Sequence, residues 1–343
     1  MIIKNQLIKV FIIFIYLIFF NIFGLALVFI PLKLIKFPFN IYKNILISSI
    51  SWLTKNILYQ KIFINSNKLF AKLIDKINNS KSKIIITSNH VSNLDFMVLS
   101  LIFSSMSFYR SNIALAKKTV GFMIPVFGFF GIETQDIFLH RNIEKDYYKL
   151  NKKLEFNTIC VFPEGTCFTL DKKKISDKFC NKNNLIKFNY HLYPRTKGIE
   201  LLLVNNPEIK YIFDFSIIYK YNNQNILSSN IITKFLFNFN SIPNNVYLNI
   251  TKYSIYDRKL TSKIIEKIFI EKDDFIENIN LEPSILNKYE IINHFNTIKE
   301  FGSFILISLL NSFGIYLFYK YSFFRYLFIF EIVCYFIYFF FNV

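Results

Sequence analysis

The segment Asn89-His90-Val91-Ser92-Asn93-Leu94-Asp95 follows the apolar run Lys83–Ser88 (KIIITS) and precedes the helical pattern Phe96–Phe103. A short apolar run bounded in this way predicts a buried strand. Ser92 or Asn93 can cap the helix that follows. The segment is therefore predicted to be the loop that joins a central strand to a helix.

His90 and Asp95 are the chemically informative residues of this loop. Asp95 falls in the first turn of the predicted helix, where the helix dipole favours a negative charge. Four residues separate the two, so the turn can bring the carboxylate back to the imidazole. Such a carboxylate fixes the tautomer, and the other ring nitrogen can take a proton from a hydroxyl that attacks a thioester directly. Because a lone histidine near an aspartate is more often a capping or core residue, the interpretation depends on three further segments.

Short apolar runs continue along the middle of the chain. They alternate with polar, helix-compatible stretches such as Glu144–Glu155, which predicts an α/β domain with a mixed sheet covered by helices. The Lys- and Asn-rich segment Asp171–Asn184 is predicted to be a surface loop, and Asn222–Asn245 to be partly irregular. The other predicted strands are Ile113–Ala116, Thr158–Phe162, Ile199–Val204 and Phe213–Tyr219.

The second segment, Ile137–Arg141, places a guanidinium at the end of a predicted strand. Arg141 can hold a phosphate through two hydrogen bonds and keeps its charge, although a simple surface cation is the alternative. His140 should point away from Arg141 on a strand, so we assign it a structural role.

The third and fourth segments are loops beside predicted strands. Glu164 and Gly165 follow Pro163 at the carboxyl end of a buried strand, where α/β sheets usually bind ligands. Gly165 permits a sharp turn. Arg195 and Lys197 lie on a loop bounded by Pro194 and Gly198 and can hold a phosphate. A turn carboxylate and a solvated basic turn are the alternatives.

Both ends of the chain are strongly apolar. Val10–Ile30 is long enough to cross a bilayer, and no small-x-small cleavage site follows it, which favours an anchor over a signal peptide. Two apolar stretches, Phe304–Tyr319 and Phe323–Val343, predict a membrane hairpin, with interfacial helices as the alternative. The predicted organisation is an anchor (1–36), a second membrane or interfacial segment (37–68), a catalytic domain (69–297) and a C-terminal hairpin (303–343).

The chain is strongly cationic, with 41 Lys and Arg against 23 Asp and Glu and a net charge of +18. Because no nucleic-acid recognition motif accompanies the charge, an anionic membrane surface or anionic substrates are the expected partners. The four cysteines show no metal-binding spacing and are expected to be reduced thiols, with no metal in the site.

In order and spacing the four segments resemble the lysophosphatidate acyltransferase family of glycerolipid acyltransferases. His90 and Asp95 match its His-x4-Asp motif, Phe138–Arg141 its second motif, Phe162–Thr166 its third and Pro194 its fourth. The Tyr193–Gly198 turn and the apolar tail are most similar to the branch that includes lysocardiolipin and lysophosphatidylinositol acyltransferases.

The resemblance implies transfer of an acyl chain from acyl-CoA to a lysophospholipid, without a cofactor, at a membrane such as the endoplasmic reticulum. It implies that His90 is the general base, that Asp95 orients it, and that Arg141, Glu164, Gly165 and Thr166 bind the acceptor. Cys167 departs from the pattern, because many members carry Arg there, and Arg195 or Lys197 is the candidate replacement. Lysophosphatidate is the expected acceptor. The alternatives are another lysophospholipid, a catalytically silent membrane scaffold, and a transporter, which the polar middle of the chain disfavours.

Overall fold

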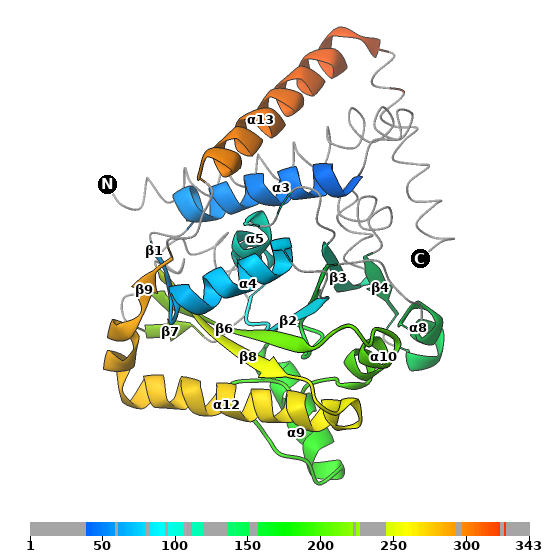
Figure 1. Ribbon diagram of the computed structural model, residues 1–343, viewed down its shortest axis with the longest axis vertical. Coiled ribbons are helices and arrows are strands. Elements are labelled where there is room, and N and C mark those ends of the chain that lie inside the picture. Colours follow the sequence, from blue (N-terminus) through cyan, green and yellow to red (C-terminus); the bar gives the residue numbers. More distant parts are fainter. Residues whose placement is uncertain are drawn as a thin grey trace.

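The computed structural model describes residues 39–58, 61–79, 83–92, 95–105, 107, 112–118, 136–140, 142–150, 157–221, 224–226, 245–292, 297–322 and 326. Over these residues the chain forms a nine-stranded sheet in the order β4-β3-β5-β2-β6-β8-β1-β9, with β7 paired to β6. Helices lie on both sides of the sheet (Figure 1). The predicted mixed sheet covered by helices is therefore confirmed.

Parallel pairs form the half of the sheet that carries the predicted loop, since β2 lies between β5 and β6 and is parallel to both. All five residues of β2 are buried, as expected for a central parallel strand. The antiparallel pairs are β6 with β7 and β8, and β1 with β9. The strands are β1 (Lys61–Ile64), β2 (Ile84–Ser88), β3 (Asn112–Lys117), β4 (Ile137–Leu139), β5 (Thr158–Val161), β6 (Tyr211–Tyr221), β7 (Gln224–Ile226), β8 (Asn245–Ser254) and β9 (Glu290–Ile291).

Two apolar cores hold the helices against the sheet. Ile84 and Ile86 of β2 belong to the core shared with α3, α4 and α5, and Ile85 belongs to the core shared with α8, α10 and α12, because side chains alternate along a strand. The helices are α3 (Phe39–Leu53, continued by the π-helical turn Thr54–Leu58), α4 (Asn67–Asn79), α5 (Asp95–Ser104), α8 (Ile143–Leu150), α9 (Leu170–Lys182), α10 (Lys197–Asn205), α12 (Thr261–Leu281) and α13 (Thr297–Lys320), with 3-10 turns at Arg258–Leu260 and Pro283–Lys288.

The prediction of a strand at Ile199–Val204 is wrong, because this segment lies within helix α10. Its buried residues are Ile199, Leu202 and Leu203, which are spaced by three and four positions. That spacing is helical, and the short continuous apolar run concealed it.

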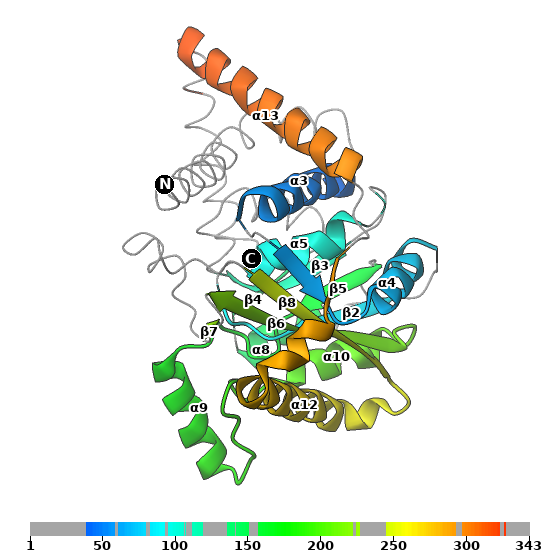
Figure 2. The same cartoon turned by 90° about the vertical axis from the view of Figure 1, so that its left-hand side faces the viewer.

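The prediction of a surface loop at Asp171–Asn184 is also wrong, because helix α9 occupies most of it. The Thr169 side chain caps the helix by accepting a hydrogen bond from the Lys172 amide. A Lys173–Asp177 ion pair lies along it, and the buried Cys180 fixes one side to the protein. Figure 2 shows α9 projecting from the rest of the fold.

The predicted membrane segments are described only in part. Residues 1–36 lie outside the described residues, as does nearly all of 323–343, so the anchor and the second half of the hairpin stay predictions. The first half, Phe304–Tyr319, lies within helix α13. Within 37–68, α3 packs on α5 and β1 pairs with β8 in the main sheet. Among the described helices, none combines the length and the apolar character that a membrane span requires.

The start of α13 is fixed by a buried carboxylate. Glu300 is 1% exposed, and the hydroxyls of Ser51 on α3 and Ser104 on α5 each donate to its Oε1 over 2.8 Å. Trp52 stacks on Phe304, with ring centroids 4.1 Å apart. These contacts join α3, α5 and α13 on one side of the sheet, with α5 nearest to it and α13 farthest from it (Figures 1 and 2).

Candidate active site

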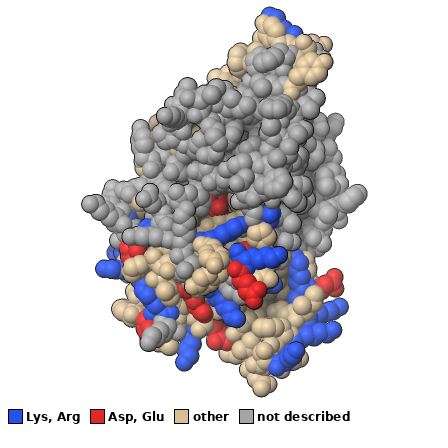
Figure 3. All heavy atoms as spheres, turned by 90° about the vertical axis from the view of Figure 1, so that its right-hand side faces the viewer, with Lys and Arg blue, Asp and Glu red and all other residues tan. Residues whose placement is uncertain are grey.

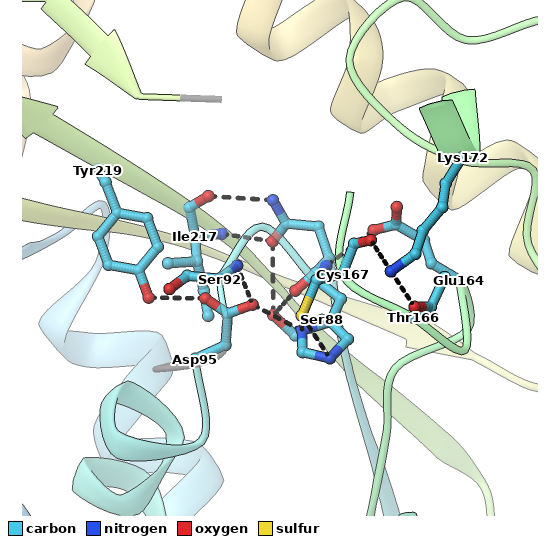
Figure 4. A network of polar contacts seen from close by, with 11 residues as sticks. Ser88, Ser92, Asp95, Glu164, Thr166, Cys167, Lys172, Ile217 and Tyr219 are labelled. Carbon is cyan, nitrogen blue, oxygen red and sulfur yellow. Dashed lines mark hydrogen bonds and ion pairs between the residues drawn. The ribbon is translucent and has the colours of Figure 1, made fainter. Parts of the chain in front are cut away.

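The loop between β2 and α5 brings His90 and Asp95 together, as predicted. His90 Nδ1 lies 2.9 Å from Asp95 Oδ2, which also accepts a hydrogen bond from the Ser92 amide over 2.9 Å. Tyr219 on β6 donates its hydroxyl proton to Asp95 Oδ1 over 2.7 Å (Figure 4). Asp95 is fully buried, whereas the His90 side chain is 22% exposed. The carboxylate therefore holds Nδ1 in a fixed position and leaves Nε2 for proton transfer.

The backbone of this loop is held from two sides. The Asn89 side chain forms two hydrogen bonds with the backbone of Ile217 on β6, one to the carbonyl (3.0 Å) and one from the amide (2.7 Å). On the other side, the Phe168 amide donates to the His90 carbonyl over 2.7 Å. The position of the imidazole is thus set by the sheet and not by side-chain packing alone.

Glu164 ties this loop to the loop that precedes α10. Its Oε1 accepts from the His90 amide over 2.8 Å, and its Oε2 accepts from the Leu192 amide over 3.0 Å. Glu164 is only 2% exposed, and burial raises the pKa of its carboxyl against the opposing effect of nearby histidines and of the two amide bonds. Its geometry is that of a positioning residue, and its substrate-binding role stays a prediction.

We expect Glu164→Ala to destabilise the protein. Each of the two buried amides would lose its acceptor, at a cost of about 1–3 kcal/mol for each group. Chemical denaturation followed by circular dichroism measures the loss, and Glu277→Ala on the exposed side of α12 is the matched control. Equal stability of the two variants would contradict the positioning role.

The His90 ring lies between an aromatic ring and a thiol. Phe162 stacks on it with centroids 4.3 Å apart, and Cys167 Sγ lies 3.2 Å from Nε2 and 3.5 Å from Nδ1. Burial lowers the pKa of His90, but the contacts with Asp95 and Cys167 together raise the pKa to about 10. These contacts favour the imidazolium form, which must lose one of its two protons before the ring can act as a base.

Removing the thiol should make His90 a weaker base. In Cys167→Ala we expect the pKa of His90 to fall from about 10, because one of the groups that favour the protonated ring is lost. An NMR titration of protein labelled at histidine measures this pKa directly. Cys180→Ala, whose thiol lies on α9, should leave it unchanged, and an unchanged value in Cys167→Ala would show that the thiol does not act on the ring.

The predicted phosphate-binding residues lie beside the dyad. Gly165 adopts φ +68°, a conformation that disfavours other residues, and the Arg195 side chain lies against it, so that a Cβ at Gly165 would be 3.3 Å from Arg195 Cδ. The Arg195 amide donates to the Pro163 carbonyl over 2.8 Å. The chain thus brings Gly165, Thr166 and Arg195 to one place.

Two other predicted residues are less informative. Lys197 is exposed in the first turn of α10. Arg141 lies outside the described residues, although the strand that precedes it is present as β4. The His140 amide donates to Asp146 over 2.8 Å, and the structural role of its side chain stays a prediction.

Three residues of the site were not expected from the sequence. Lys172 donates to the Thr166 hydroxyl over 2.6 Å and to the Cys167 carbonyl over 3.1 Å (Figure 4), which adds a cation to the predicted phosphate site. Tyr219 orients Asp95, and Cys167 contacts the base. A tyrosine in a buried strand is a usable signal, because its hydroxyl needs a partner.

A model of the Acyltransferase family matches residues 69–199, the stretch that contains the dyad, Glu164 and Arg195. Residues 69–199 are thus similar to an acyltransferase domain. The resemblance to glycerolipid acyltransferases predicted from the four segments is therefore confirmed.

Curated relatives match part of the chain. Lysocardiolipin acyltransferase 1 of Danio rerio is 28% identical over 148 residues, which are 40% of this chain and 38% of that protein. Lysophosphatidylinositol acyltransferase 10 of Caenorhabditis elegans is 32% identical over 155 residues, 41% of this chain and 39% of that protein. The chain thus spans about two fifths of the length of these relatives.

Two further likenesses involve proteins named for lysophosphatidate. The 1-acyl-sn-glycerol-3-phosphate acyltransferase delta of Mus musculus is 28% identical over 128 residues, 35% of this chain and 34% of that protein. The crystal structure of the 1-acyl-sn-glycerophosphate (LPA) acyltransferase PlsC from Thermotoga maritima aligns with 80% of this chain and 95% of that chain, at 16% identity and a TM-score of 0.46.

Proposed function

We propose that this protein transfers an acyl group from an acyl thioester, acyl-CoA, to the free hydroxyl of a lysophospholipid. The observation that carries the proposal is the His90–Asp95 pair, with Nδ1 held at 2.9 Å from a buried carboxylate inside an acyltransferase domain. No metal or prosthetic group is needed, since a thioester is already activated toward an alkoxide.

In the direct form of the reaction, neutral His90 takes the proton of the acceptor hydroxyl at Nε2 as the oxygen attacks the thioester carbonyl. Asp95 stabilises the imidazolium that forms, and the proton then passes to the departing CoA thiolate. A positioned general base typically contributes about 10²–10⁴-fold in rate. The hydrogen bonds from Ser92 and Tyr219 keep the carboxylate in place throughout.

Lysophosphatidate is the first proposed acceptor. Its phosphate would lie against Gly165 and Thr166, where Arg195 and Lys172 supply positive charge and where a backbone without a Cβ permits close approach. Arg141 would contribute a further guanidinium. This arrangement would compensate for Cys167, which stands where the family resemblance implies an arginine.

The second proposed acceptor is a lysophospholipid with a larger head group, because two of the matched relatives are named for lysocardiolipin and lysophosphatidylinositol. Competition among lysophosphatidate, lysophosphatidylinositol and lysocardiolipin on purified protein, with CoA release as the readout, separates the two. A preference for lysophosphatidate supports the first, and a flat preference would contradict both. No release with any acceptor would favour the silent scaffold.

Helix α9 supports action at an anionic membrane surface. Its exposed side carries Lys174, Lys178 and Lys182 at successive intervals of four, next to the exposed Ile175 and Phe179. Such a face can place its lysines among anionic head groups and its apolar residues below them. In Figure 3 blue side chains gather around tan ones at the lower right, the end of the molecule where α9 projects.

Reversing these three lysine charges to glutamate should abolish stimulation by anionic lipid. Each lysine near such a surface contributes about 1 kcal/mol, so the loss in apparent affinity for anionic mixed micelles should be about 100-fold. The measurement is the transfer rate in neutral micelles against micelles that contain phosphatidylserine.

The same reversal at three exposed lysines elsewhere is the matched control, namely Lys68, Lys210 and Lys263. It changes net charge equally but leaves α9 intact. If both triple variants lose stimulation to the same degree, total charge and not α9 is responsible.

A further inference from the structure

Asp273 on α12 is bonded to the loop that precedes α10. Its Oδ2 accepts a hydrogen bond from the Asn189 amide over 2.6 Å, and its Oδ1 accepts one from the Tyr190 amide over 2.8 Å. The His191 ring nitrogen Nδ1 lies 3.0 Å from the same Oδ1. Burial alone would raise the pKa of Asp273, but the bonds from His191 and from the two amides lower it. Three donors therefore converge on one ionised carboxylate, and they fix three consecutive residues of the loop.

His191 and Asp273 form a second histidine–aspartate pair, but this pair is closed to substrates. The His191 side chain is 1% exposed, and its ring meets the Phe269 ring edge to face, with centroids 5.5 Å apart. Its other ring nitrogen, Nε2, is buried and has no hydrogen-bond partner among the described residues. Asp273 is thus the only described group that holds the ring by a hydrogen bond. The pair therefore has the geometry of a support and not of a second base.

The loop passes this constraint on to the dyad through Glu164. Leu192 directly follows His191, and its amide donates to Glu164 Oε2 over 3.0 Å. The other oxygen, Oε1, accepts from the His90 amide over 2.8 Å. Burial raises the pKa of Glu164, and the charge of His191 is the largest influence that opposes this rise. Asp273, the loop and Glu164 thus form one continuous connection from α12 to the backbone of the candidate base.

The residue before Asp273 supports the same site through the sheet. Lys272 Nζ lies 2.9 Å from Asp214 Oδ1 on β6, and both side chains are nearly fully buried, at 2% and 3% exposure. The Thr87 hydroxyl on β2 donates to the same oxygen over 2.6 Å, three positions before His90. Buried charges are costly unless they are paired, so this contact is a specific one. Helix α12 thus contacts both the strand that ends at the dyad and the loop that faces it, from the side of the sheet opposite α5 (Figure 1).

We propose that Asp273 and His191 are positioning residues for acyl transfer, which hold the backbone of His90 in its reactive place through Glu164. The inference rests on the proposed function and deepens it, because it extends the catalytic unit to α12. Asp273 lies beyond residue 199, where the match to the Acyltransferase family ends. The site is therefore completed by a helix outside the matched stretch.

The first test is Asp273→Asn, which keeps the size of the side chain. The asparagine can accept at only one atom, so at least one of the three donors loses its partner and the loop shifts. A misplacement of about 1 Å can cost about 100-fold in rate, so we expect kcat for acceptor-dependent CoA release to fall about 10- to 100-fold. Asp274→Asn removes the same charge from the exposed side of α12 and should keep the wild-type kcat.

A spectroscopic readout separates positioning from simple loss of stability. The chain has four histidines, so protein labelled with ¹⁵N only at histidine gives four backbone amide signals. A hydrogen bond to a carboxylate moves an amide proton downfield, and we expect the His90 signal to move upfield in Asp273→Asn as Glu164 is released. The His140 amide donates to a different carboxylate and should stay in place. Leu73→Ala, in the core shared with α3, α4 and α5, should lower the melting temperature and leave the His90 signal unchanged.

A double-mutant cycle tests whether Asp273 acts through Glu164. If it does, Glu164→Gln and Asp273→Asn remove the same support, so the double variant should lose little more kcat than Glu164→Gln alone. Losses that multiply would mean that the two carboxylates act independently and would overturn the inference. A lower melting temperature in Asp273→Asn, with wild-type kcat and an unmoved His90 signal, would overturn it as well.

Failure of the proposed function is recognised separately. A wild-type protein that acylates no lysophospholipid would overturn the proposed function and with it this inference, and the His90 signal would then report only the structural coupling. A wild-type protein that transfers the acyl group, with kcat and the His90 signal unaffected by Asp273→Asn, would leave the proposed function standing and remove the inference alone.

Discussion

Replacement of His90 by alanine is expected to reduce acceptor-dependent CoA release by about 10²–10⁴-fold, to the limit of detection. The imidazole is the sole side chain placed between the buried carboxylate and the reacting hydroxyl in our proposal. Asp95 cannot replace it, because the Asp95 side chain is fully buried. The measurement is CoA release from oleoyl-CoA with and without lysophosphatidate.

Two further variants make the result specific. His90→Asn keeps a polar side chain of smaller size beside Phe162, so it tests the chemistry with less loss of packing. His140→Gln changes another histidine, on the loop after the edge strand β4, and should retain turnover. Release that persists in both His90 variants would remove this residue from its assigned role.

The dyad could be predicted from the sequence because it is local. His90 and Asp95 lie within one loop and the first turn of one helix, so their spacing alone brings them together. The apolar run before them was enough to place the loop at the end of a central strand, and β2 is found there.

The support for the dyad could not be predicted, because it comes from distant parts of the chain. Tyr219 is 124 positions from Asp95 and reaches it only because β6 lies beside β2. The two bonds that Glu164 makes likewise depend on how the loops around His90 and Leu192 meet. Pairing of non-adjacent strands is a tertiary property that a local pattern does not contain.

The errors in secondary structure have a common origin. Ile199–Val204 is a short apolar run in which helix and strand periodicities cannot be told apart. Asp171–Asn184 has the composition of a loop, yet helix α9 forms there, with a side-chain cap at Thr169 and one buried residue, Cys180. That second error also concealed Lys172, since a lysine in a loop has no predictable direction.

The second large effect is expected for Asp95→Asn, which keeps the size of the side chain and removes its charge. Three donors point at the present carboxylate, from His90, Ser92 and Tyr219. An amide has only one oxygen, so an NH2 donor replaces one of the two carboxylate oxygens. If the NH2 group faces His90, the ring takes the wrong tautomer. If the NH2 group faces Tyr219, the tyrosine proton must turn elsewhere.

In either orientation the imidazolium loses the negative charge that stabilises it. We therefore expect turnover to fall by on the order of 10⁴-fold, the loss that the corresponding change causes in Ser-His-Asp triads. The pKa of His90 should fall as well, and the histidine NMR titration measures it independently of activity. Tyr219→Phe keeps the charge and removes one neutral donor, so its effect should be about tenfold. If Asp95→Asn were no worse than Tyr219→Phe, Asp95 would be a structural residue, and the raised pKa of His90 would have to come from Cys167 alone.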